Sequence, residues 1–594
     1  MRKLIKLVKK SLSYVDARNR KRVILLVPIQ VGLGILDLLG VILLGTVGTL
    51  GFKILSNDSK PTRLEIILKS IMPTGISTEK LTVILACIAI LVLGTKTALQ
   101  AFINFKYINF LARLESDLSG KLFSRLIYAD ASKLNANKYS DYQYSLTIGA
   151  NRAVTGIIQS AISFVSDSLT TILMSLLALY ASPLAFLLAM AIFGLTYLAI
   201  NGPIHKVSNQ YGERSMNVHI SLTEKLLENF RGIKDVRVYK KEDRLIEIFN
   251  EEKKEQSLLG QKVFWISSIS RYFFEFSILI AGAAIIAVLT ATTDIRRTVT
   301  VLVIFISIGY RLIPNIQRIQ NSLVSLRIAE GATSTFFEFL DKFDETKNVR
   351  PRSREILSDE DFEFLELEKI GFNYPDNLQQ ETISNISFKI TKNSTLAVIG
   401  ESGSGKTTLA DIISGINFPT NGKIRFNRKI DENTLSDLKP SVGYVSQSTS
   451  LFGDNIYENI AFGSSDEFLD TKKIETILSE LNLDFLFTQG EGGSIRNIRS
   501  DGTNLSGGER QRISIARVEY ANPSLIVFDE PTSSLDEENK SRVINFIQKI
   551  SGKKTIVIVT HSLDLLELCD HVLLMRNGRL EFFGSVIDFK SKNL

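Results

Sequence analysis

Long apolar runs occupy the first 320 positions of the chain, and shorter ones alternate with helical patterns after about residue 357. Six runs have the length and apolarity of membrane helices. They cover about 23 to 52, 81 to 105, 157 to 180, 182 to 201, 272 to 293 and 298 to 322. An even number of spans returns the chain to the side on which it started, so both flanks of this region are predicted to be cytoplasmic.

The connections between the runs differ in length. Only "ASP" separates the third run from the fourth and "TDIRR" the fifth from the sixth, whereas about 50 and 70 residues join the second to the third and the fourth to the fifth. Tight turns are therefore predicted outside and long polar helices inside. The segments "DASKLNANKYSDYQYSL" and "ENFRGIKDVRVYKKEDRLIEIF" are then placed to touch a cytoplasmic domain. Solvated helical hairpins without a transmission role are the alternative.

The N-terminal stretch "MRKLIKLVKKSLSYV" has apolar residues at helical spacing with lysines between them, which predicts an amphipathic helix on the membrane surface. Nine of residues 1 to 22 are basic and only Asp16 is acidic. Nucleic-acid binding is one explanation of such a run. The cytoplasmic flank of a first membrane helix explains it better, and no cleavage site precedes the apolar run.

Composition supports a membrane region joined to a soluble domain. The chain has 594 residues, of which 45% are apolar and 22% charged, with a net charge of +7 and a mean hydropathy of +0.12. This length predicts two or three domains. Cys87 and Cys569 are the only cysteines, so a disulfide framework is not expected.

From about residue 357 the pattern becomes that of an α/β domain. The runs "TLAVIG", "SLIVFDE" and "TIVIVTH" are typical of buried parallel strands. We therefore predict four segments: an amphipathic helix at 1–22, a six-helix membrane domain at 23–343, a charged linker at 344–356 and an α/β domain at 357–594.

The stretch "GESGSGKTT" follows the first of these strands and precedes a helical pattern. Its glycines let backbone amides turn toward phosphate oxygens, Lys406 supplies a positive charge to the outer phosphates, and Thr407 can ligate Mg²⁺. This is the pattern of a phosphate-binding loop. The predicted nucleotide-binding residues of the loop are Gly400, Glu401, Ser402, Gly403, Ser404, Gly405, Lys406, Thr407 and Thr408.

Two further motifs follow. In "SLIVFDEPTSSLD", Asp529 ends a strand, where it can hold Mg²⁺, and Glu530 beside it can orient or deprotonate an attacking water. In "LSGGERQR", Ser506, Gly507 and Gly508 open a predicted helix, whose free amides and dipole favour an anion.

These motifs, in this order, resemble the nucleotide-binding domain of the ABC transporter family. "LSGGERQR" matches the family signature, and Gln447 in "GYVSQ" matches the glutamine that senses Mg²⁺ and the membrane domain. His561 in "VTHS" matches the switch histidine, and Ser534 to Asp536 match the D-loop. Tyr374 in "GFNYP" matches the aromatic residue that stacks on adenine, although a tyrosine there can equally belong to the core.

Six spans followed by one such domain resemble an exporter-type half-transporter of this family. The fold class implied is an α-helical six-span transmembrane domain plus an α/β P-loop ATPase domain. In the family two ATP molecules lie between paired domains, which implies a homodimer. One position departs from the pattern: Ser500, in "IRSDG", stands where many exporters carry an acid before the signature.

Four basic residues lie in or beside the apolar runs, at depths that helix geometry places near the cytoplasmic half of the bilayer. An intramembrane cation suggests a functional site, and here the set suggests a basic surface that receives an anionic lipid-linked substrate. The alternative is structural pairing with Asp37, Asp167 and Glu275. The segment "YRLIPNIQR" is also similar to bacterial flippases for lipid-linked oligosaccharides. The predicted substrate residues are Lys96, Arg271, Arg311 and Arg318.

The sequence thus predicts a homodimeric ATP-driven exporter or flippase that uses ATP and Mg²⁺. It is expected in a plasma membrane of the bacterial inner-membrane type, with its ATPase domain cytoplasmic and no nucleic-acid partner. Glu530 is assigned as the catalytic base, with Lys406 and His561 on the γ-phosphate. Thr407, Gln447 and Asp529 are assigned to Mg²⁺, and Asp536 to the nucleotide interface. A peptide or drug exporter and an ATP-gated channel or regulator are the alternatives.

Overall fold

The computed structural model divides into two compact units. The first comprises Met1–Ile127 and Asn137–Glu345, and the second Tyr128–Ala136 and Thr346–Leu594. The predicted linker at 344–356 lies outside the described residues. Described are residues 2–55, 78–129, 131–292, 295–343, 363–374, 381–426, 442–447, 449–452, 455–462, 469–487, 498, 504–533 and 535–592.

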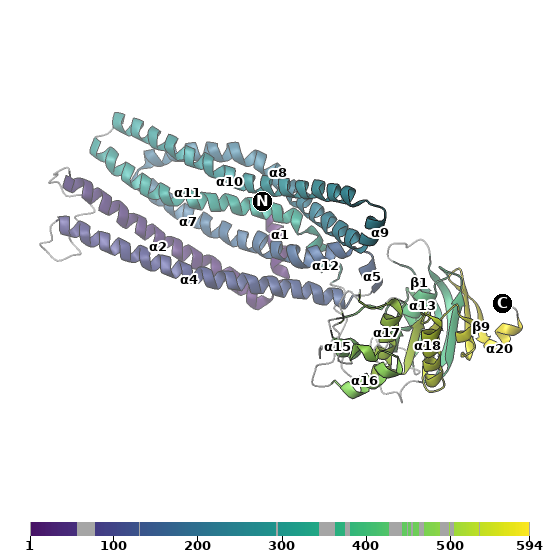
Figure 1. Ribbon diagram of the computed structural model, residues 1–594. Coiled ribbons are helices and arrows are strands. Elements are labelled where there is room, and N and C mark those ends of the chain that lie inside the picture. The colour runs from purple at the N-terminus through teal and green to yellow at the C-terminus, as the bar shows by residue number, and fades with distance from the viewer. Residues whose placement is uncertain are drawn as a thin grey trace. The chain divides into compact units, whose positions relative to one another are not determined.

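Long helices that run side by side build the first unit (Figure 1). The longest, α4, α8 and α10, have 49 to 51 residues each and so extend about 75 Å, far beyond a hydrocarbon core of about 30 Å. The helices are α1 (Arg2–Ser13), α2 (Ala17–Leu55), α4 (Thr78–Ile127), α6 (Tyr139–Tyr144), α7 (Ser160–Ala181), α8 (Pro183–Arg231), α9 (Ile233–Val238), α10 (Glu242–Thr292), α11 (Ile295–Ala332) and α12 (Ser334–Lys342), with π-helical stretches η1 (Ser145–Gly149) and η2 (Arg152–Gln159) before α7.

In the described part of the chain, all six predicted apolar runs are helical apart from Ser182. Within the described residues, four stretches are long and apolar enough to cross a membrane: Ala17–Gly48, Glu79–Ile127, Tyr139–Tyr180 and Arg271–Ala291. The fourth predicted run corresponds to a shorter apolar helix, Pro183–Ala199, and the sixth lies in α11. The tight turn predicted between the third and fourth runs is present, because Ser182 alone separates α7 from α8. The one predicted between the fifth and sixth runs includes residues 293 and 294, which lie outside the described residues.

Small residues allow some of these helices to approach closely. A Cβ atom added to Gly34 of α2 would lie 2.1 Å from Thr170 Cγ2 of α7, and one added to Gly212 of α8 would lie 2.2 Å from the Ile328 carbonyl oxygen of α11. Such contacts bring helix backbones together in a bilayer, where apolar burial alone does not drive association.

Within the predicted N-terminal segment 1–22, helix α1 covers Arg2–Ser13 and α2 already begins at Ala17. Helix α1 packs against other helices of its own unit. Ser11 Oγ donates to the Ala153 carbonyl of η2. The Lys10 ammonium pairs with Asp341 of α12 at 2.5 Å, and the Tyr14 hydroxyl donates to the same carboxylate. Polar contacts therefore join α1 to η2 and α12.

The second unit contains two sheets. The larger has the order β5-β6-β7-β3-β8-β9, with parallel pairs from β5 to β8 and an antiparallel edge strand β9. The smaller is antiparallel, in the order β2-β1-β4. The strands are β1 (Phe364–Phe372), β2 (Ile383–Thr391), β3 (Thr395–Gly400), β4 (Asn421–Phe426), β5 (Val442–Val445), β6 (Leu525–Asp529), β7 (Thr555–Val559), β8 (His571–Arg576) and β9 (Arg579–Ser585).

Helices flank the parallel sheet (Figure 1). Two clusters of buried apolar side chains fill the space between the layers. Every residue of β6 and β7 is buried, as expected of parallel strands covered on both faces. The helices are α5 (Ala131–Asn135), α13 (Lys406–Ile413), α15 (Ile456–Ile460), α16 (Thr471–Glu480), α17 (Gly507–Ala521), α18 (Glu537–Ile550), α19 (Leu563–Leu566) and α20 (Val586–Ser591), with a 3-10 turn η7 (Asp484–Leu486).

Candidate functional site

The carboxyl ends of β3, β7, β6 and β5 meet at one edge of the parallel sheet, where ligands bind in open α/β folds. The predicted phosphate loop follows β3. Gly400, Gly403 and Gly405 have φ values of 151°, 79° and 96°, which other residues rarely adopt. A Cβ atom on Gly400 would lie 2.2 Å from the Met575 carbonyl oxygen, so this position also requires the absence of a side chain.

Lys406 begins α13 and is 7% exposed. Its ammonium donates to the carbonyl oxygens of Gly400 and Glu401 at 2.9 and 2.8 Å, so it lies over the loop. Burial lowers the pKa of Lys406, and the carboxylates of Glu530 and Asp529 partly offset this effect. One of the three ammonium protons remains for an anion at the loop.

Asp529 ends β6 and is 2% exposed. Burial raises the pKa of its carboxyl group, and hydrogen bonds from Thr407 and Tyr444 act in the opposite direction. The structure therefore brings together Thr407 and Asp529, two of the three side chains predicted to hold Mg²⁺.

Glu530 follows directly and has φ 50°, in the left-handed region that glutamate rarely occupies. Its amide donates to the Val559 carbonyl of β7, and Gln511 donates to its carbonyl at 3.0 Å. The Glu530 carboxylate accepts from Gln447 Nε2 at 3.0 Å and lies 3.6 Å from His561 Nε2. Backbone strain is typical of functional sites, and here the strained residue directs its carboxylate toward two other predicted site residues, Gln447 and His561.

Three residues at this edge were not predicted: Tyr444, Asp411 and Gln511. The Tyr444 hydroxyl of β5 lies 3.2 Å from Asp411 Oδ1 and 3.3 Å from Asp529 Oδ2. Burial raises the pKa of Asp411 to about 6. The available signal was the position of Tyr444 three residues before Gln447, on a strand next to β6.

Gln511 of the signature contacts Glu530, whereas the first residues of the motif make no described contact with the phosphate loop. Ser506 caps α17 and forms a capping box with Glu509, so two of the amides predicted to be free are already bonded within the motif. The amides of Gly507 and Gly508 remain at the helix start. Among the described residues, no hydrogen bond or ion pair joins Ser506, Gly507 or Gly508 to the phosphate loop.

The remaining predicted nucleotide contacts are less distinctive. Asp536 accepts from the Asn539 amide and so caps α18, and Ser534 lies outside the described residues. The Tyr374 ring meets Phe372 edge-on, with centroids 5.0 Å apart, and its hydroxyl is 3.2 Å from Thr408 Oγ1. Tyr374 therefore borders the phosphate loop while part of its ring belongs to the core.

The residues fit a nucleotide with Mg²⁺. The glycine backbone forms a cradle, and Ser404 Oγ is buried there without a hydrogen-bond partner among the described residues. Lys406 adds positive charge, and a hydroxyl and a carboxylate, the hard oxygen ligands that Mg²⁺ prefers, lie side by side at Thr407 and Asp529.

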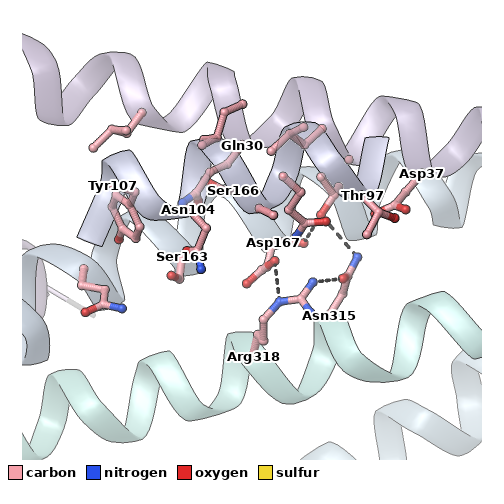
Figure 2. A pocket seen from close by; sticks show the side chains of 18 of the residues that line it. Gln30, Asp37, Thr97, Asn104, Tyr107, Ser163, Ser166, Asp167, Asn315 and Arg318 are labelled. Carbon is pink, nitrogen blue, oxygen red and sulfur yellow. Dashed lines mark hydrogen bonds and ion pairs between the residues drawn. The ribbon is translucent and has the colours of Figure 1, made fainter. Parts of the chain in front are cut away.

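In the membrane unit, three of the four predicted substrate cations have carboxylate partners. Lys96 pairs with Asp37 at 2.8 Å and Arg271 with Glu275 at 2.7 Å. The Arg318 guanidinium donates to Asp167 at 3.0 Å (Figure 2). The side chain of Arg311 lies outside what the structure describes. For these three residues the pairing that the sequence left as an alternative is present.

Comparison with known proteins identifies both parts of the chain. Residues 53–312 match the model of the ABC transporter transmembrane region, and residues 383–533 match that of the ABC transporter domain. The fold is similar to that of a bacterial Atm1-family ABC exporter with ATP bound, with a TM-score of 0.76, 17% identity and coverage of 98% of this chain and 97% of that one.

Curated relatives extend over most of the chain. An ATP-dependent lipid A-core flippase of Saccharophagus degradans is 27% identical over 84% of this chain and 83% of its own length. An ATP-dependent lipid A-core flippase of Burkholderia pseudomallei is 26% identical over 80% of this chain and 78% of its own length. With a transmembrane region and an ATPase domain of the same family in one polypeptide, this protein belongs to the ABC transporters, as a half-transporter of the exporter type that binds ATP and is built to couple its hydrolysis to movement across a membrane.

Proposed function

We propose that this protein is a homodimeric flippase or exporter that moves an amphipathic lipid-linked substrate, such as a lipid-linked oligosaccharide with an anionic group. The placement of Glu530 between Gln447 and His561, at the end of the strand that carries Asp529, is the observation that carries the ATPase half of this proposal. The long membrane helices carry the transport half.

Glu530 is proposed as the base or water-orienting group. Its strained backbone orients the carboxylate, Gln447 Nε2 donates to one of its oxygen atoms, and His561 Nε2 lies 3.6 Å from the other. Lys406 and His561 provide positive charge or hydrogen-bond donors for the terminal phosphate of ATP. A group so oriented needs little reorganisation when the water attacks.

Thr407, Asp529 and Gln447 are proposed to hold Mg²⁺. The ion, when bound, neutralises charge on the phosphate oxygens. Tyr444 positions the Asp529 carboxylate for that role through its 3.3 Å contact. The raised pKa of Asp529 agrees with a buried carboxylate whose charge awaits a cation.

The signature supports a homodimer. Ser506 and Gly507 are exposed at the start of α17, and within one chain they have no contact with the phosphate loop among the described residues. A second copy related by a two-fold axis would bring each signature to the other copy's loop. This assembly predicts a particle with two chains of 66.3 kDa.

The relatives' description as lipid A-core flippases supports a lipid-linked cargo for this chain as well. The basic run at 1–22 supports a cytoplasmic N-terminus, because basic flanks stay inside, and hence a cytoplasmic ATPase domain. Lys96, Arg271 and Arg318 are each paired with a carboxylate. The proposed contact with the substrate anion therefore uses the N–H donors of these cations that the carboxylates do not occupy.

The test is turnover of purified protein in liposomes that contain a lipid-linked oligosaccharide in one leaflet. Glu530→Gln should retain ATP binding and lose hydrolysis and lipid movement by at least about 100-fold, as expected for loss of a positioned acid–base group. Glu537→Gln, which changes an exposed helix-start acid nearby in sequence, is the matched control. Ample hydrolysis by Glu530→Gln would refute the assignment, and ion current without lipid movement would favour the channel.

A further inference from the structure

A polar pocket of about 490 Å³ lies within the helical bundle of the membrane unit. This volume is in the range of small-molecule sites. Side chains from α2, α4, η2, α7 and α11 line it, and Figure 2 shows them converging from these helices. The polar lining residues are Gln30, Asp37, Thr97, Gln100, Asn104, Tyr107, Gln159, Ser163, Ser166, Asp167, Thr170, Asn315 and Arg318.

Helical spacing brings these residues together. Thr97, Gln100, Asn104 and Tyr107 recur every three or four positions along α4, so they share one face. A second polar stripe runs from Gln159 through Asp167 to Thr170 on the neighbouring helix. Polar residues are costly at membrane depth and mark functional sites there.

Depth along the helices places the pocket toward one leaflet. Asp167 is 15 residues from the turn at Ser182, or about 22 Å, in a hydrocarbon core of about 30 Å. Arg318 is 23 residues, or about 35 Å, from the start of α11 at the other short connection. The Asp167–Arg318 pair therefore lies near the headgroups on the side away from the short turns.

The charges of the pocket cancel. Asp37, Asp167 and Arg318 are the charged lining residues, and Lys96 pairs with Asp37. Arg318 additionally donates to the amide oxygen of Asn315, whose nitrogen donates to Thr170 Oγ1 at 3.4 Å. The guanidinium is thus engaged by neighbours from two directions, and the lining offers no net positive charge to a bare anion.

Several neutral groups of the lining remain available. Within the described part of the chain, the side-chain amides of Gln30, Gln100, Asn104 and Gln159 make no hydrogen bond. Each amide carries two donors and one acceptor oxygen, the combination that hydroxyl groups satisfy from both sides. Gln100 and Asn104 are exposed, so the pocket can be entered along α4.

The same stretch of α4 carries exposed apolar side chains beside the polar stripe. Leu99, Phe102 and Phe105 are 45%, 61% and 63% exposed. A ligand with a hydroxyl-rich head and a hydrocarbon tail would fit both features. We propose that this pocket binds the sugar headgroup of a glycolipid through its neutral amides and hydroxyls. This inference rests on the proposed transport function and adds to it: the pocket contacts the sugar of the lipid-linked substrate rather than its anionic group.

The test measures ATPase activity of the full chain in nanodiscs with increasing galactosyl-diacylglycerol, or with dioleoyl phosphatidic acid as the sugar-free anionic lipid. The glycolipid should stimulate hydrolysis and phosphatidic acid should not. Gln30→Leu with Asn104→Leu should raise the half-stimulating glycolipid content about tenfold, the loss expected for a few hydrogen bonds. Because two leucines can disturb folding, Gln30→Ala with Asn104→Ala should give the same shift.

Asn109→Leu is the matched control, because Asn109 is exposed on α4 and lies outside the pocket lining. Its half-stimulating content should equal that of the unchanged protein. Soluble methyl-galactoside tests whether the bound sugar is free or attached to a lipid. Stimulation by methyl-galactoside alone would indicate a free sugar, whereas stimulation only by the glycolipid would indicate a lipid-attached sugar. Either result supports sugar binding in the pocket.

Two results would overturn the pocket assignment: no glycolipid stimulation, or stimulation that the four pocket changes leave untouched. Basal ATP hydrolysis by Lys406→Ala, measured in the same nanodiscs, tests the proposed ATPase function separately from the sugar site. If this hydrolysis is lost while the glycolipid has no effect, the ATPase assignment stands and the sugar site falls.

Discussion

The Tyr444 hydroxyl lies 3.3 Å from Asp529 Oδ2, on the strand next to the one that Asp529 ends. The same hydroxyl is 3.2 Å from Asp411 Oδ1. A phenol has a single proton to donate, so the two carboxylates compete for it. The orientation of a proposed Mg²⁺ ligand is therefore coupled to a residue of α13 that no ATPase motif includes.

Tyr444→Phe should raise the Mg²⁺ concentration for half-maximal ATPase activity about two- to tenfold. The variant removes a hydrogen bond worth about 0.5–1.5 kcal/mol from the carboxylate that would hold the ion. Tyr457→Phe is the control, since Tyr457 donates to Glu475 at 2.9 Å in the same unit. Equal Mg²⁺ dependence in both variants would remove Tyr444 from the site.

The pKa of Asp411, raised by burial from 3.8 to about 6, predicts a pH-dependent stability. Between about pH 4 and 6 the folded chain binds more protons at this carboxyl group than the unfolded chain. Its contribution to the free energy of unfolding therefore falls as pH rises through this window and is constant above it. Asp411→Asn has no such titration.

The thermal midpoint of the unchanged protein, relative to Asp411→Asn, should fall between pH 4 and 6 and stay level above pH 7. Measurement in nanodiscs by differential scanning fluorimetry gives this difference directly. Asp529 shares the Tyr444 hydroxyl with Asp411, so both proteins carry Asp529→Asn in this comparison, which removes the titration of Asp529. A difference that does not change with pH would show that the pKa of Asp411 is the same in the folded and the unfolded chain.

The ATPase motifs could be located from sequence because each lies at a strand end, and the parallel sheet then brings those ends together. Asp529 and Lys406 lie at the same edge of the sheet for that reason. Tyr444 and Asp411 were missed because their contact depends on β5 lying beside β6, a neighbour relation that periodicity does not encode. The membrane cations and the carboxylates Asp37, Asp167 and Glu275 could both be named from sequence, because charged residues stand out in apolar runs. Which carboxylate pairs with which cation could not, since Arg318 and Asp167 are 151 positions apart.

Glu530→Gly should stabilise the protein while abolishing hydrolysis. A left-handed backbone costs a residue with a side chain about 1 kcal/mol or more, and glycine avoids this cost. The thermal midpoint should rise by about 2–4 °C for a domain of this size. Glu537→Gly, in the first turn of α18, should lower it. A fall in both variants would mean that the Glu530 backbone is not strained.

Mixed dimers should recover activity that each parent lacks. A chain with Lys406→Ala keeps its signature, and one with Ser506→Arg keeps its phosphate loop, so a heterodimer contains one intact composite site. Random pairing makes half of the dimers mixed, and about a quarter of unchanged activity should return if the two sites act independently.

Co-expression provides the unfractionated mixture. Purification by two affinity tags isolates the mixed dimers, which should retain about half of the unchanged activity. Pairing Lys406→Ala with Thr407→Val is the control, because both changes affect the phosphate loop and cannot complement each other. Activity of the first mixture no greater than that of this control would contradict independent composite sites formed between two chains.

Double substitutions separate the two interpretations of the membrane cations. Lys96→Gln leaves Asp37, which is 18% exposed, without the ammonium that pairs with it, and loss of one partner of a buried pair typically costs about 3–5 kcal/mol. If Lys96 serves mainly as this partner, adding Asp37→Asn should restore both the thermal midpoint and lipid movement. If Lys96 binds the anionic group of the substrate, the double variant should regain stability and remain defective in transport.

The same pair of experiments applies to Arg318 and Asp167. A lipid-movement assay with the sugar-bearing lipid and with phosphatidic acid would show which of the two lipids is no longer transported. Restoration of transport in both double variants would assign these cations to the bundle and would leave the neutral amides of the pocket as the groups that recognise the cargo.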